Sequence, residues 1–255
     1  MDTLVCTMDA AETIRNSVAR VTALRRAAAA HDDLQAANRA VKRLQARRFA
    51  GTYADLLESS EYSGAARFFL DELYSDKDYS LRDAQFSRIA GALQTFFPEQ
   101  VVATAVALAE LHALTEELDQ EMALAWLAQG GQPSLSETAR YMGTWKTVAR
   151  KDDRDRQLAV VLQVGSELDR LTRKPGLRMM LRMMRKPAEV AGLGALQSFL
   201  EAGFDTFAAM AGKGSKAKEF LETIRRREAG WLALLYGPDT VTCETELALC
   251  LGKVP

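Results

Sequence analysis

A stretch of apolar residues between positions 99 and 128 constrains the fold more than any other part of the sequence. From Val101 to Leu114, valine, alanine and leucine occupy nearly every side of a helix. A helix that is apolar all round is normally buried at the centre of its domain. We therefore expect a central helix here, with residues 100–118 forming the most buried helix of the fold.

Helix-forming residues dominate the rest of the chain. Only six prolines occur, and no segment alternates apolar and polar residues long enough to predict a strand. Apolar residues at helical spacing predict a helix over residues 9–30, and Asp32 or Asp33 can cap a second helix. We expect an N-terminal α-hairpin at about 9–48, packed on a single all-α domain that spans residues 1–255 and is about 70% helical.

About ten helices are expected around the central one. Ser80-Leu-Arg-Asp83 resembles a capping box with aspartate in place of glutamate, which predicts a helix start at Ser80. Pro98 should end that helix before the central one begins. Further helices are predicted at about 51–58, 63–74, 135–149, 152–172, 176–185, 187–210, 215–229 and 240–250.

Composition limits the classes of protein to which the chain can belong. It is 48% apolar and 26% charged with a formal net charge of −1, which argues against a polycation built for nucleic acid. The N-terminus lacks the pattern of a signal peptide, and no apolar run approaches the roughly 20 residues of a membrane span. The three cysteines form no C-x-x-C pair, which argues against a disulfide framework. We expect a cytoplasmic protein without a transmembrane segment.

The stretch RFFLDELY, residues 67–74, places two phenylalanines beside an acidic pair. On a helix, Phe69 and Leu73 share one face, Tyr74 lies alongside, and Phe68 widens the apolar surface. We interpret the motif as a core helix, with Phe69, Leu73 and Tyr74 mainly buried. The motif residues considered for a role are Arg67, Phe68, Phe69, Asp71, Glu72 and Tyr74.

The outer side of this helix is expected to be solvated. Arg67 and Asp71 stand four residues apart and can form an ion pair, while Glu72 is expected to face water. The alternative is that the two acids serve as ligands or as a recognition edge. A carboxylate site needs partners, and the sequence alone supplies none.

The motif and its surroundings resemble a known family. RFFLDELY, followed by SDKDYSLRDAQFSRI and FFPEQVVATAVALAELHAL, is similar to a bacterial family named after its FFLEELY motif. The similarity runs across most of the chain and is strongest from about Arg67 to Leu118. Asp71 replaces the first glutamate of that motif, which keeps the charge and shortens the side chain. The resemblance implies a bacterial source and a helical domain, and it transfers no catalytic residue.

The sequence contains no recognisable catalytic or metal-binding constellation. Neither His31 nor His112 stands in the Glu-x-x-His setting of a di-iron bundle, because Glu110 is only two residues before His112. His112 and Glu116, four residues apart, are expected to form a polar core pair; a metal or haem ligand at His112 is the alternative. We expect no catalytic residue, no bound transition metal and no cofactor.

One segment, RKPGLRMMLRMMRKP at 173–187, stands out by its charge and its methionines. It holds six basic residues, no acid and four of the nine methionines. We expect a short helix whose apolar stripe, Leu177, Met180, Leu181 and Met184, faces inward. Its basic residues are predicted to form an anion-binding edge for an acidic protein or an anionic small ligand; they are Arg178, Arg182, Arg185 and Lys186. The alternative is that the methionines pack the core and the arginines are merely solvated.

Two classes of function remain open from the sequence. The first is a non-enzymatic binding or regulatory protein that uses this basic helix. The second is a helical carrier or enzyme that holds a small apolar ligand, such as a lipid, quinone or haem, between helices. The absence of a catalytic constellation favours the first class. Nucleic acid is disfavoured as a partner because no second basic stretch extends the surface. The sequence does not define an oligomeric state.

Overall fold

The computed structural model describes residues 9–73, 77–130, 135–211 and 214–253. The structure is 85% helical, with 13 helices and no strands among these residues, which confirms the all-α prediction and exceeds the expected helix content. The helices are α1 (Ala10–Ala29), α2 (Asp32–Thr52), α3 (Ala54–Glu58), α4 (Ser63–Leu73), α5 (Ser80–Phe96), α6 (Glu99–Ala128), α7 (Glu137–Val148), α8 (Lys151–Thr172), α9 (Leu177–Met183), α10 (Arg185–Val190), α11 (Gly194–Ala211), α12 (Lys216–Tyr236) and α13 (Thr240–Leu251).

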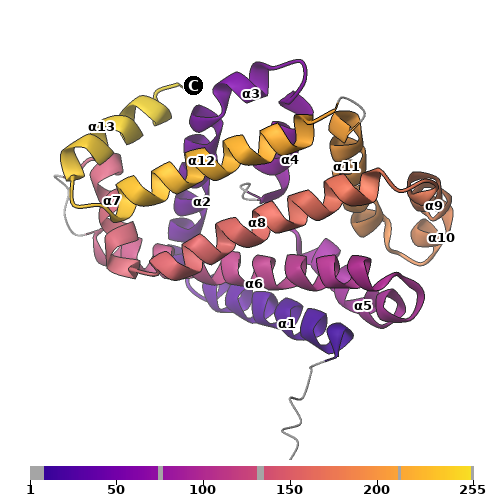
Figure 1. The fold of residues 1–255 in the computed structure, drawn as a ribbon. Coiled ribbons are helices and arrows are strands. Elements are labelled where there is room, and N and C mark those ends of the chain that lie inside the picture. Colours follow the sequence, from indigo (N-terminus) through magenta and orange to yellow (C-terminus); the bar gives the residue numbers. More distant parts are fainter. Residues whose placement is uncertain (1–8, 74–76, 131–134, 212–213, 254–255) are drawn as a thin grey trace, which may run out of the picture.

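Helix α6 runs through the middle of the molecule (Figure 1) and contacts α1, α2, α5, α7 and α8. The first two helices form the expected consecutive pair, but each packs chiefly on α6 rather than on the other. Figure 1 shows α1 lying along α6 while α2 rises across it. No described helix has the length and apolarity that a membrane crossing requires.

Burial along α6 is less even than its sequence suggests. From Leu111 onward the helix is regularly buried, and Leu118 and Met122 are fully inaccessible to solvent. Between Glu99 and Glu110 most residues are partly buried or exposed, and one side of this half borders a cavity. The most buried part therefore begins later and extends further than residues 100–118. In the first half of α6, apolar residues line the wall of the cavity instead of filling a core.

The buried apolar side chains form three separate clusters. The first joins α1, α2, α6, α7, α12 and α13. The second joins α2, α3, α4, α11 and α12, and the third joins α1, α5 and α6. Trp145 belongs to the first, Phe69 to the second and Ala105 to the third, and all three also line one cavity. The helices thus enclose a hollow between three packed regions.

Several predicted helix boundaries need correction. Ser80 does begin α5, but its backbone N–H donates to Asp78 Oδ1 at 2.9 Å, and Asp83 is buried instead of closing a capping box. The helix predicted at 187–210 is divided into α10 and α11, because Gly192 adopts a φ of 67° between them. The break falls after residue 190 and not before Pro187, which lies in the first turn of α10, where its missing N–H costs nothing.

The RFFLDELY motif occupies most of α4, and its core interpretation is confirmed at Phe69. This ring is 4% exposed and meets Phe220 edge to face at 5.3 Å. Asp71 is exposed, as expected, and lies 3.6 Å from Lys77 rather than bonding to Arg67 among the described contacts. The side chain of Leu73 and all of Tyr74 lie outside the described residues.

Glu72 does not face water as predicted. Its Oε2 accepts a 2.7 Å hydrogen bond from Nη1 of Arg82, which arrives from α5. Only 24% of the Glu72 side chain is exposed, and the residue lines the cavity. The spacing of residues within α4 could not predict this contact, because Arg82 belongs to another helix, α5.

Gly51 permits close contact between α2 and α13. A Cβ atom at this position would lie 2.0 Å from the carbonyl oxygen of Cys250 and 2.9 Å from its Sγ. We predict that Gly51→Ala lowers the free energy of unfolding by about 1–3 kcal/mol, because backbone atoms of α13 must move.

The measurement is urea unfolding followed by circular dichroism, and the matched control is Gly230→Ala in the middle of α12. Nothing lies within 4 Å of the added Cβ at Gly230, so that change should raise stability by about 0.5–1 kcal/mol. Equal effects of the two substitutions would contradict the close contact.

Candidate ligand-binding cavity

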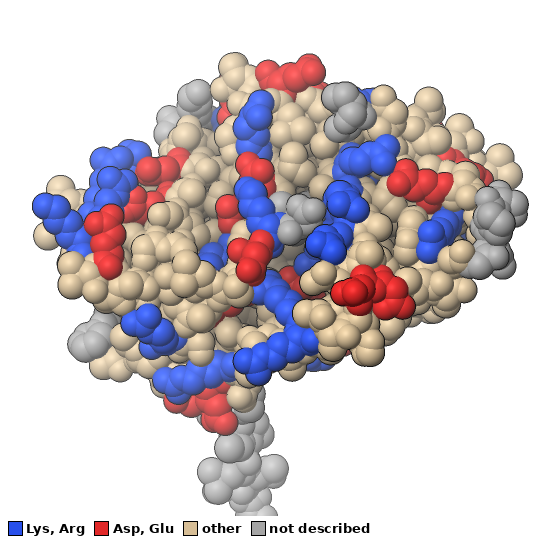
Figure 2. All heavy atoms as spheres, turned by 180° about the vertical axis from the view of Figure 1, so that it is seen from behind, with Lys and Arg blue, Asp and Glu red and all other residues tan. Residues whose placement is uncertain are grey.

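The hollow between the three clusters has a volume of about 530 Å³ and a mainly apolar lining. Volumes of roughly 300–1,000 Å³ are typical of small-molecule sites, which combine apolar walls with a few placed polar groups. Eleven helices, α1, α2 and α4 to α12, contribute side chains to its walls. Figure 2 shows a hollow near the centre of one face, with blue and red side chains at its edge.

The apolar part of the cavity is built by α5, α6, α9 and α11. Its wall includes Phe86, Leu108, Phe199, Leu200 and Phe204. Phe199 also stacks on Phe68 of the RFFLDELY motif, with ring centroids 5.9 Å apart. Aromatic and aliphatic side chains from helices distant in sequence therefore surround a space suited to an apolar chain or ring.

The methionine-rich helix α9 forms one wall of this space. Its predicted inward stripe, Leu177, Met180, Leu181 and Met184, lines the cavity. On the opposite side, Met179 and Met183 are 66% and 71% exposed. The methionines therefore do not pack a closed core, and their flexible side chains suit a wall that adapts to its contents.

The predicted basic edge on α9 and α10 is only partly open. Arg178 Nε donates to Asp205 Oδ1 at 2.8 Å, and Arg185 Nε donates to Glu201 Oε2 at 2.7 Å. Arg182 and Lys186 are exposed and make no hydrogen bond or ion pair among the described residues. Two of the four cations are thus held by acids of α11, so an incoming anion meets mainly the other two.

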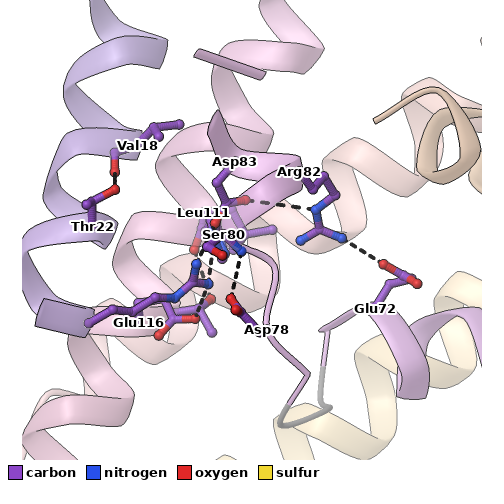
Figure 3. A network of polar contacts seen from close by, with 12 residues as sticks. Val18, Thr22, Glu72, Asp78, Ser80, Arg82, Asp83, Leu111 and Glu116 are labelled. Carbon is purple, nitrogen blue, oxygen red and sulfur yellow. Dashed lines mark hydrogen bonds and ion pairs between the residues drawn. The ribbon is translucent and has the colours of Figure 1, made fainter. Parts of the chain in front are cut away.

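A cluster of charged side chains forms the polar side of the cavity. We call it the ion cluster; it consists of Arg25, Lys42, Asp83, His112 and Glu116, brought together from α1, α2, α5 and α6. Arg25 donates to Asp83 Oδ2 at 2.8 Å and to Glu116 Oε1 at 3.0 Å, and Lys42 Nζ lies 3.0 Å from both oxygens of Glu116. Figure 3 shows Asp83 and Glu116, the two carboxylates of the ion cluster.

The predicted pairing of His112 with Glu116 is wrong in its partner. His112 Nε2 lies 2.9 Å from Asp83 Oδ2, whereas Glu116 is bonded by Arg25 and Lys42. Both predicted residues do belong to the same cluster, linked through Arg25. Among the described residues, no nucleophilic side chain bonds to His112 and no group of three or more His, Cys, Asp or Glu could hold a metal ion.

Charge pairing sets the protonation of the two buried carboxylates. Burial would raise the pKa of Asp83, but its hydrogen bond to His112 and the nearby positive charges outweigh that effect and hold the pKa below its ordinary value. Burial would also raise the pKa of Glu116, but the charges of Lys42 and Arg25 outweigh it and hold this pKa below the ordinary value. Both groups are therefore ionised at neutral pH.

Acid should destabilise the protein through this ion cluster. Where folding lowers a carboxyl pKa, the group stabilises the fold above its ordinary pKa, and this contribution is lost as the pH falls through the lowered pKa. We expect the Tm to fall progressively below about pH 4, the ordinary range of carboxyl pKa values. Calorimetry between pH 7 and pH 2 measures this, and Glu116→Gln should make the fall shallower. A Tm that falls equally steeply in the variant would contradict the assignment.

Arg82 connects the ion cluster to the apolar part of the cavity. Its guanidinium lies 4.0 Å from the ring centroid of Tyr79 and 4.4 Å from that of Phe199. It also bonds to Glu72 and stands 3.9 Å from Asp83 (Figure 3). A cation held between two rings and two acids fixes the boundary between the charged and apolar sides.

The chain matches one protein family over most of its length. The family is described as Domain of unknown function (DUF8198), and the match covers residues 24–240. The chain belongs to this family. No curated protein and no solved structure matches it. In this DUF8198 member, every residue that lines the cavity except Val18 lies inside the matched range.

Sequence reasoning missed most of the polar residues of the DUF8198 cavity. Lys42, Arg48, Arg154 and Glu228 were not named, and Asp83 was named only as part of a helix cap. Arg25, which bonds to Asp83 beside the cavity, was not named either. One signal was present: charged residues that interrupt the apolar face of a helix, such as Lys42 beside Val41 and Asp119 beside Leu118. Charges at such positions are buried only when partners exist.

Proposed function

We propose that this protein binds an elongated amphipathic small molecule in the cavity, as a non-enzymatic carrier or sensor. The observation that carries the proposal is the 530 Å³ mainly apolar hollow between three packed clusters. Protein interiors are close-packed, and voids much larger than a water molecule are few. A hollow of this size is best explained by a ligand that fills it.

The arrangement of the walls supports an amphipathic rather than a wholly apolar ligand. Aromatic and aliphatic residues surround the part near α9 and α11, and buried charged residues surround the other part. An apolar body in the first part removes hydrocarbon from water, and a polar group in the second finds hydrogen-bonding partners. No buried nucleophile accompanies His112 among the described contacts, so binding is favoured over catalysis.

The test blocks the cavity with one side chain and measures binding of a fluorescent fatty acid, dansyl-undecanoate. Ala105 lines the cavity and is 9% exposed, so Ala105→Phe should fill it and weaken binding at least tenfold. Ala103, two residues away on α6, is exposed and does not line this cavity. Ala103→Phe is the matched control and should leave binding unchanged. Equal affinities of the two variants would place the probe elsewhere and overturn the proposal.

The basic helix supports a second candidate role, contact with an acidic protein. Arg182 and Lys186 are exposed, and residues 173–187 contain no acid. We expect Arg182→Gln/Lys186→Gln to reduce recovery of acidic partners at low salt, compared with the control Lys218→Gln/Arg226→Gln on α12. Equal recovery from the two variants would show a merely solvated helix. We also infer a bacterial origin, supported by the similarity of RFFLDELY to FFLEELY, and a cytoplasmic location, supported by three cysteines that form no C-x-x-C pair.

A further inference from the structure

Two buried donors face the cavity without an acceptor. Arg154 of α8 is 6% exposed and Trp145 of α7 is 5% exposed, and both line the cavity. The Arg154 guanidinium lies over the Trp145 ring at 4.5 Å, and its Nη1 donates to Gln157 Oε1 at 3.1 Å. Its Nη2 and the Trp145 Nε1 are buried and have no hydrogen-bond partner among the described residues.

Each of the two donors lies near a phenol, but neither phenol completes a hydrogen bond of normal geometry. The pKa of Tyr141 and that of Tyr236 are raised, mainly by burial, so both stay neutral. The Tyr141 hydroxyl lies close to the Trp145 N–H, and the Tyr236 hydroxyl lies close to the Arg154 guanidinium. Among the described contacts, no hydrogen bond of normal geometry joins either pair. Buried donors almost always have partners in native structures, and an unpartnered guanidinium N–H is especially costly.

The acids around Arg154 are already engaged elsewhere. Glu228 is bonded by both Nη atoms of Arg48 and by the phenol of Tyr53. Asp119 accepts from Gln45 and lies 3.9 Å from Lys42, and it makes no ion pair with Arg154 within 4.0 Å. Burial also raises the pKa of Asp119, which weakens it as a counter-charge. Arg154 is therefore the cavity cation with the least compensation.

We propose that the head group of the ligand is a carboxylate held by Arg154 and Trp145. This inference rests on the proposed function. One carboxylate oxygen would accept from Arg154 Nη2 and the other from Trp145 Nε1, while the hydrocarbon chain extends through the apolar part towards α9. Arg154 supplies the positive charge, and a hydrogen bond between a guanidinium and a carboxylate is stronger than one between neutral groups. A phosphate dianion would bring more charge than one uncompensated cation offsets. The ligand class is thus a long-chain carboxylic acid.

The experiment compares three probes that share a tail and differ only in the head: hexadecanoate, hexadecan-1-ol and methyl hexadecanoate. Calorimetric titration of the full chain should give at least tenfold tighter binding of hexadecanoate than of the ester. Arg154→Met should bring the acid to the affinity of the ester and leave the ester unchanged. Trp145→Phe removes only the indole N–H and should weaken the acid alone, by several-fold.

The outcomes separate this inference from the proposed function. If the wild-type protein binds acid, alcohol and ester equally, the cavity binds apolar molecules but the carboxylate assignment is wrong. If none of the three binds, both proposals fail. Should Arg154→Met not fold, Trp145→Phe decides alone, because it keeps the aromatic surface beneath the guanidinium. If Trp145→Phe still prefers hexadecanoate over the ester as strongly as the wild-type protein does, the inference is overturned.

Discussion

Replacing Arg48 by methionine is expected to lower the free energy of unfolding by about 3–5 kcal/mol, the range for removing one partner of a buried ion pair. Arg48 is 4% exposed and donates from both Nη atoms to Glu228, at 3.2 and 2.8 Å. Tyr53 adds a third hydrogen bond to the same carboxylate at 2.9 Å. The variant leaves the Glu228 charge buried with only a neutral partner. Urea unfolding measures the loss.

Two further variants distinguish the stability cost of a buried, uncompensated charge from the cost of losing a surface charge. Arg48→Met/Glu228→Met removes both charges and should recover much of the lost stability, because no charge is then left uncompensated. Arg47→Met is the matched control: its partner Glu137 is exposed, and such a surface pair contributes about 0–1 kcal/mol. If Arg48→Met costs no more than Arg47→Met, the buried pair does not hold α2 to α12.

Phe69→Ala should lower the free energy of unfolding by about 3–5 kcal/mol, the usual range for a large core aromatic. The ring lies in the second cluster, 4% exposed and edge-on to Phe220. Its loss leaves a void next to an existing cavity. Thermal unfolding of the variant measures the effect.

Phe68→Ala is the comparison for this prediction, since the neighbouring ring is only partly buried. It should cost clearly less than Phe69→Ala. A near-neutral effect at Phe69 would show that the RFFLDELY motif is a surface, and the core interpretation would be wrong.

Helices were predictable because their signals are local. The spacing of apolar residues gave the α1, α2 and α6 segments, and Pro98 marked the boundary between α5 and α6. The division of residues 187–210 was missed because it depends on the conformation of Gly192. The inward placement of Phe69 followed from helical spacing alone, whereas the partner of Glu72 did not.

The cavity and its charges could not be predicted from spacing. Arg25 meets Asp83 across 58 positions and Glu116 across 91, and no local pattern specifies such partners. Glu116 was assigned to His112 because the two are four residues apart, but stronger cations reach it from α1 and α2. The cavity lies between three separate hydrophobic clusters, and their separation depends on the tertiary packing of all the helices. The methionines of α9 were conspicuous, and only the fold shows that they form a wall.

Native mass spectrometry of the protein purified from its host tests the central claim most directly. We expect a complex heavier than the polypeptide by one amphipathic molecule, which organic solvent releases. The added mass should be absent from Ala105→Phe, in which the new ring fills the cavity, and retained by Ala103→Phe. A bare polypeptide mass for all three proteins, together with no binding of dansyl-undecanoate, would contradict the claim that the cavity is a ligand site.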